Sequence, residues 1–186
     1  MVARTAIRLS GGLANSKLVN CGALMNKSNE SASSPRSIES VEELRGLIGQ
    51  EVGASDWFVV SQELVNRFAD LTHDPQWIHT DPVRAQRESP YGTTIAHGFL
   101  TLSLLSHLQR QAVQIRGDFS RAINYGFNRV RFPEAVPVGS RIRVHSTLAA
   151  VDEIEAGFQI AWDLVVEIEG RQKPAAAAQW LVRLYR

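Results

Sequence analysis

Two residues in the segment DPQWIHTDP, residues 74–82, have side chains suited to acid–base chemistry. Asp74 and His79 are five residues apart, and a loop can fold so that both side chains face one small volume. On an ideal helix the same spacing would make them diverge. A histidine moves protons near neutral pH, and a nearby carboxylate orients a water molecule or takes a second proton. The spacing alone favours a different interpretation, a capping aspartate beside a partly buried structural histidine.

A second segment, IAHGF at residues 95–99, offers a place for negative charge. We expect Gly98 to begin a helix, whose first N–H groups have no intrahelical partner and lie at the positive end of the helix dipole. Glycine also lets a ligand carbonyl approach the backbone closely. Together, the two segments suit the addition of water to an α,β-unsaturated thioester, or its removal, because charge builds on the thioester oxygen as a proton moves.

Helical patterns lie on both sides of the first segment. Ser61 is a suitable N-cap, and apolar residues at helical spacing predict an amphipathic helix over about residues 62–71. Pro82 is suited to the first position of a short helical turn that ends near Ser89. The sequence therefore predicts that the acid–base segment connects two helices.

A longer helix is predicted from Gly98 to Ile115. Its apolar residues cover most of its circumference, which is typical of a buried helix; they are Phe99, Leu100, Leu102, Leu104, Leu105 and Leu108. Further strand-like runs follow it, at residues 123–132, 141–151, 157–169 and 175–186. The third run alternates apolar and polar residues, which predicts a sheet with one covered face. We therefore expect an α+β fold in which an antiparallel sheet wraps around a long buried helix.

The composition limits the classes of protein to consider. A chain of 186 residues that is 44% hydrophobic and 21% charged suits one globular domain. Its longest apolar run, Gly98 to Leu108, is too short for a membrane span. A net charge of +1 and the lack of a long basic face give no reason to expect a nucleic-acid partner. A single cysteine, Cys21, excludes an intramolecular disulfide and favours a reducing compartment such as the cytoplasm.

Residues 1–37 differ in composition from the rest of the chain. They contain five Lys or Arg and one acidic residue, Glu30, so the segment carries a net charge of +4 and the remainder −3. A segment rich in Ser, Asn and Gly predicts a flexible extension that precedes a domain over residues 38–186. We favour a dispensable extension. The alternative is an organelle transit peptide, which would direct the protein to the mitochondrial matrix.

The segments FADLTHDPQWIHTDPVRA and SPYGTTIAHGFLTLSLL resemble the hydratase motif of the MaoC-like family, and QWIH resembles its nodulation-protein-N-like branch. The resemblance covers roughly residues 38–186. The family pattern is approximately S-G-D-x-N-P-I-H, followed downstream by A-H-G. This chain has Thr72, His73, Gln76 and Trp77 in place of the serine, glycine, asparagine and proline. His73, beside Asp74, is expected to alter the pKa of the aspartate or the backbone of the loop.

This resemblance implies a hot-dog fold, a homodimer and a coenzyme A thioester substrate. It implies (R)-specific hydration of 2-enoyl-CoA to 3-hydroxyacyl-CoA, or the reverse dehydration. Asp74 and His79 correspond to the catalytic pair, and the Gly98 N–H to the donor at the thioester carbonyl. Gln76 can still form the hydrogen bond of the asparagine that it replaces.

Other polar residues are open to two interpretations. Arg129 and Arg131 alternate with Val130 on a predicted strand, so they either form a solvated edge face or contact a phosphate of coenzyme A. His97 is expected to shape the turn into the long helix. His79, Asp81 and His97 lack a recognised ligand spacing, so the sequence predicts neither a metal site nor a cofactor.

Two further functions remain open. A hot-dog acyl-CoA thioesterase is expected to depend on a differently placed carboxylate. A non-enzymatic acyl-CoA binding module would tolerate the loss of both Asp74 and His79. The presence of both residues favours the hydratase.

Overall fold

The computed structural model of the protein describes residues 34–186. The predictions about an extension or transit peptide, and Cys21, concern residues outside this range, except for residues 34–37. The helices are α1 (Val41–Arg45), α2 (Gln62–Thr72), α3 (Trp77–Thr80), α4 (Pro82–Glu88) and α5 (Gly98–Ala112). The strands are β1 (Arg36–Ile38), β2 (Glu51–Ala54), β3 (Phe58–Val59), β4 (Val113–Ile115), β5 (Arg121–Arg131), β6 (Arg141–Ile154), β7 (Gly157–Ile168) and β8 (Ala176–Tyr185).

The main sheet has six strands and is antiparallel. Its order is β2-β6-β7-β8-β5, and β3 also pairs with β6. β6 and β7 form a long hairpin from Ile142↔Ile168 to Ile154↔Gly157, and β8 continues the sheet from Gly157↔Tyr185 to Val166↔Ala176. β5 pairs with β8 and lies at the edge of the sheet.

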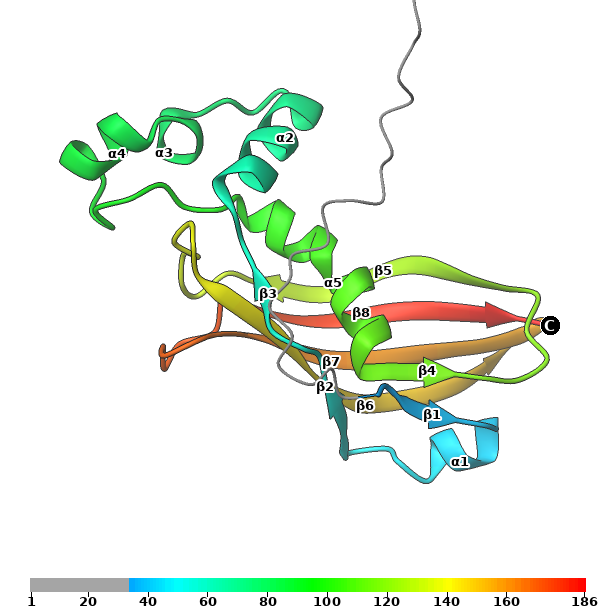
Figure 1. Cartoon of the computed structure of the whole chain (residues 1–186). Helices are drawn as coiled ribbons and strands as arrows, with labels where there is room; N and C mark the ends of the chain where they lie inside the picture. Colours follow the sequence, from blue (N-terminus) through cyan, green and yellow to red (C-terminus); the bar gives the residue numbers. More distant parts are fainter. Residues whose placement is uncertain (1–33) are drawn as a thin grey trace, which may run out of the picture. The chain divides into compact units, whose positions relative to one another are not determined.

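The core lies between this sheet and α5 (Figure 1). Leu105 and Leu108 of α5 are fully buried, as are Ile160 and Leu164 of β7. Alternate residues of β7 point to the core, as the period-two pattern predicted. The predicted α+β architecture, an antiparallel sheet against a long helix, is confirmed.

The long helix was predicted to end too late in the sequence and to be more buried than it is. α5 ends at Ala112, and residues 113–115 form β4, which pairs in parallel with β1. Strand β4 begins and ends with β-branched residues, which favour extended backbone. Phe99 is 70% exposed, so α5 buries a face rather than its whole circumference. Among residues 34–186, no helix is long and apolar enough to cross a membrane.

Helices α2, α3 and α4 lie at one end of the fold, beside the N-terminus of α5 (Figure 1). α2 contacts α3, and α3 contacts α4. The sequence predicted α2 and α4 but not α3, which has only four residues. These short helices carry the acid–base segment to the start of α5.

Candidate active site

Asp74 follows a left-handed turn at the end of α2. His73 has φ 56° and ψ 36° and caps the helix, while the Asp74 N–H donates to the Ala69 carbonyl at 3.0 Å. Glycine adopts this conformation without a Cβ penalty, whereas another residue is disfavoured by about 1–2 kcal/mol. His73, which replaces the glycine of the family pattern, therefore adopts a backbone conformation that glycine would adopt with less strain.

His79 lies on α3 with only 9% of its surface exposed. Its Nδ1 is 2.7 Å from the Ile95 carbonyl oxygen, which can only accept, so Nδ1 carries the proton. In the neutral ring, Nε2 then has the free lone pair. The side-chain amide of Gln62 donates to the His79 carbonyl at 2.7 Å and fixes the backbone of α3.

The surroundings of His79 favour its neutral form. Burial is the largest influence and lowers the pKa of His79 from its ordinary value of 6.5. The hydrogen bond to Ile95 and the charge of Asp74 oppose this shift, while the neighbouring His97 adds to it. The net effect is a lowered pKa, so at neutral pH His79 is ready to accept a proton.

Asp74, His79 and His97 come together in space. One ligand-type atom from each lies within 4.8 Å of the others. The rings of His79 and His97 stack with centroids 3.7 Å apart and planes inclined by 26°. Lone pairs on nearly parallel rings do not converge on one point, so metal coordination by both would require a ring to rotate. The cluster thus brings two imidazole rings and a carboxylate into one small volume.

Gly98 is the first residue of α5, as predicted. A Cβ placed on Gly98 would come within 3.2 Å of the Phe132 ring, which follows β5. Its N–H belongs to the first turn, where backbone donors lack intrahelical partners. The Phe132 ring thus occupies the space that a Cβ would need, which gives a packing reason for glycine at this position.

The other predicted site residues lie in different places. Gln76 precedes α3, where its side chain is exposed and its carbonyl accepts from the His79 N–H at 2.9 Å. Arg129 on β5 pairs with Asp163 at 3.0 Å. The Arg131 guanidinium donates to the Val130 carbonyl at 2.8 Å, immediately before Phe132. Gly98 thus lies near the end of β5 that carries Arg131.

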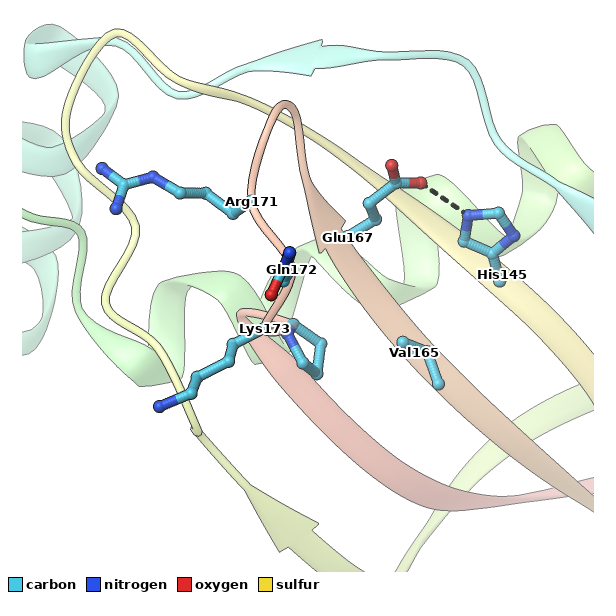
Figure 2. A pocket seen from close by; sticks show the side chains of 7 residues that line it. His145, Val165, Glu167, Arg171, Gln172 and Lys173 are labelled. Carbon is cyan, nitrogen blue, oxygen red and sulfur yellow. Dashed lines mark hydrogen bonds and ion pairs between the residues drawn. The ribbon is translucent and has the colours of Figure 1, made fainter.

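Two cavities lie outside the Asp74–His79 cluster. A cavity of about 510 Å³ separates the C-terminal half of α5 from β5, β7 and β8, with Gln109, Ile123, Trp162 and Trp180 in its lining. A smaller one of about 180 Å³ is lined by residues of β6, β7 and the following turn. Figure 2 shows His145 directed toward Glu167 at this smaller pocket.

The sequence interpretation missed two residues of the site. His97 was expected only to shape the turn, yet it contacts both members of the acid–base pair. Gln62, which binds the His79 backbone, lies 17 residues earlier in α2. In the sequence, the position of His97 next to Gly98 could have indicated that it belongs to the site. The contact of Gln62 with His79 follows only from the packing of α2 on α3.

Comparison with known proteins identifies the class of protein. Residues 43–165 match the MaoC-like domain family, and the chain belongs to this family. It resembles the (R)-hydratase from A. caviae involved in PHA biosynthesis, with a TM-score of 0.57 and 23% identity over 74% of this chain and 96% of that structure. The predicted hot-dog fold is confirmed.

The individual relatives are more specific. The chain is 52% identical to 3-hydroxyacyl-thioester dehydratase Z of Mycobacterium tuberculosis, over 80% of this chain and 97% of that protein. It is 44% identical to nodulation protein N of Rhizobium meliloti, over 76% of this chain and 89% of that protein. The prediction of an enzyme of the hydro-lyase class is confirmed.

Proposed function

We propose that the protein catalyses the (R)-specific hydration of 2-enoyl-CoA thioesters to 3-hydroxyacyl-CoA and the reverse dehydration. Asp74 and His79 act as the acid–base pair, and the Gly98 N–H donates to the thioester oxygen. The relative named a 3-hydroxyacyl-thioester dehydratase supports the thioester substrate. The observation that carries the proposal is the tautomer of His79, which leaves Nε2 unprotonated in a ring that has a nitrogen within 4.8 Å of an Asp74 carboxylate oxygen.

The reaction requires the addition of one water molecule across a double bond. The carboxylate of Asp74, whose side chain is 58% exposed, orients a water against His79 Nε2. Nε2 accepts a proton from this water as its oxygen bonds to C3. The π electrons move toward the thioester oxygen, and the resulting enolate takes this proton back from Nε2 at C2, so that one water is added and His79 returns to its neutral form. Such groups contribute typically about 10²–10⁴ in rate.

Backbone geometry supports stabilisation of the enolate. Negative charge develops on the thioester oxygen, and the first N–H groups of α5 are unpaired donors at the positive end of a helix dipole. The cavity of about 510 Å³ along α5 has the size of a small-molecule site and is a candidate for the acyl chain.

The remaining substrate contacts are assigned from position. Arg131 is exposed near the end of β5, close to the segment that contacts Gly98, so its guanidinium can contact a coenzyme A phosphate. Arg129 can do so only by sharing or leaving its ion pair with Asp163. Gln76 is exposed and can bind the substrate through its amide.

The enzyme is proposed to act as a homodimer. β5 is an edge strand, and Ile123 and Tyr125 on it are exposed, as is Phe132 just beyond it. An unpaired edge with apolar side chains is a surface that proteins usually cover. Pairing of two β5 edges would cover it and bring the two α5 helices onto one continuous sheet.

A spectrophotometric assay tests the proposal. Crotonyl-CoA and longer enoyl-CoA substrates should lose the absorbance of the conjugated double bond, without release of free coenzyme A thiol. Release of thiol would instead indicate a thioesterase. Saturable binding with neither change would indicate an acyl-CoA binding module.

A further inference from the structure

His97 is a buried titratable residue that the proposed reaction does not use. It precedes Gly98 at the start of α5, and only 4% of its surface is exposed. Its ring stacks on His79, and Phe68 of α2 packs against it with ring centroids 5.1 Å apart. The imidazole therefore lies in a confined space between the catalytic histidine and α2.

Only one ring nitrogen of His97 has a hydrogen-bond partner among the described residues. Nε2 lies 3.0 Å from the Asp74 carbonyl oxygen, which can only accept, so Nε2 carries the proton. Nδ1 is buried and has no hydrogen-bond partner among residues 34–186. A buried unpaired nitrogen is unfavourable, and an apolar ring would avoid it. An apolar ring, however, could not form the Nε2–H hydrogen bond to the Asp74 carbonyl, so this bond is what a histidine adds here.

This bond fixes a residue that is otherwise held weakly. The Asp74 carboxylate is mostly exposed, and the preceding His73 has a left-handed backbone that disfavours the turn. The Asp74 N–H is bound by α2 through Ala69, and its carbonyl is bound by His97. His97 thus contacts Asp74 by a hydrogen bond, His79 by ring stacking and Gly98 through the chain.

We propose that His97 is a positioning residue, which fixes Asp74 and His79 relative to each other and to the Gly98 N–H. The inference rests on the proposed hydration. His97 does not itself transfer the proton, because its protonated nitrogen is engaged with a backbone carbonyl and its other nitrogen is buried. A small displacement of catalytic groups lowers the rate strongly even when the substrate still binds.

Two substitutions separate the hydrogen bond from the ring. His97→Phe keeps a ring against His79 but removes the donor, whereas His97→Gln keeps a side-chain N–H that can reach the Asp74 carbonyl. We expect His97→Phe to lower kcat for crotonyl-CoA hydration about 10-fold or more, with a much smaller change in KM. His97→Gln should recover part of this loss. His107→Phe, a control on the same helix at a half-buried site, should leave kcat unchanged.

Nitrogen-15 NMR of the histidine side chains provides a readout that does not depend on turnover. In the wild type, His97 should be the Nε2–H tautomer. His97→Phe with wild-type kcat would overturn the inference. A wild type that does not hydrate enoyl-CoA would overturn the proposed function. Even in that case, NMR would test the positioning role, because a proton on Nδ1 rather than Nε2 of His97 would refute it.

Discussion

The Nδ1–H of His79 donates to the carbonyl of Ile95 across 2.7 Å, although the two residues are 16 apart in the chain. Ile95 lies in the segment that leads into α5, where its own N–H also binds the Ile78 carbonyl at 3.1 Å. This pair of bonds joins α3 to the start of α5. The consequence is chemical, because the bond from His79 to Ile95 sets the tautomer of His79 and leaves Nε2 as the nitrogen that can accept a proton.

The pH dependence of activity should report His79. Protonated Nε2 cannot accept a proton from water, so kcat/KM should fall on the acidic side. Burial first, and then His97, lower the pKa of His79 below 6.5, so the midpoint of this fall should lie below pH 6.5. Rates measured from about pH 5 to 8 test this. A midpoint well above the ordinary value would contradict the assignment of His79 as a buried neutral base.

His145 should make the stability of the fold depend on pH. Its stabilising effect should be largest at acidic pH, where the activity that depends on His79 is expected to fall. It binds Glu51 through Nδ1 and Glu167 through Nε2, at 2.9 and 2.8 Å (Figure 2 shows the latter). Burial lowers the pKa of His145, but these two carboxylates outweigh burial and raise it above 6.5. Its contribution is therefore fully present below the unfolded pKa and is lost as pH rises through the folded pKa.

The substitution His145→Gln tests this contribution. It should reduce the free energy of unfolding by about 1 kcal/mol near pH 5.5 and by less near pH 8, since a partly exposed pair is screened by solvent. Urea denaturation at both pH values measures the difference. An equal loss at both would show that packing of the ring, rather than its charge, stabilises β2 against β6 and β7.

Truncations should locate the start of the domain. Ile38 is fully buried, and its carbonyl accepts from the Arg116 N–H at 2.8 Å. Removal of residues 1–33 should leave the thermal midpoint unchanged, whereas removal of residues 1–39 should lower it by several degrees, because burial of an isoleucine contributes about 2–5 kcal/mol. Differential scanning calorimetry compares the two. A large loss from the shorter deletion would contradict the proposed domain boundary.

A charge on the edge strand should disrupt the proposed dimer. Ile123→Lys places an ammonium on β5, where it would be buried by a second copy of the edge. Val165→Lys is a matched control, because Val165 is equally exposed but lies on β7, between two paired strands. Light scattering should show a monomer for Ile123→Lys and a dimer for the wild type and the control. A dimeric Ile123→Lys would place the interface elsewhere.

The sequence predicted the elements whose patterns are local. α2 and α4 had capping residues, and β7 had an alternating pattern, so both the kind of element and its approximate bounds followed. β1 and β4 were missed because three residues carry too little pattern, and each is stabilised only by the other. Phe99 was expected to be buried because periodicity cannot show which face of a helix the sheet leaves open.

The same distinction applies to the candidate site. Residue types drew attention to Asp74, His79 and Gly98, and the resemblance to the MaoC-like family implied their roles. The tautomer of His79 depends on a carbonyl 16 residues away, and the contacts of His97 depend on how α2 packs against α5. Neither follows from spacing, because each arises from tertiary contacts between segments with no joint sequence pattern.

The most direct test of the acid–base pair is a double-mutant cycle on crotonyl-CoA hydration. Asp74→Asn and His79→Ala should each lower kcat by about 10² or more while circular dichroism stays unchanged. If the two residues act on one water, the double mutant should be little slower than either single mutant, because members of one catalytic unit are not additive. Wild-type rates in either single mutant, with the fold intact, would contradict the assignment of Asp74 and His79 as the catalytic pair.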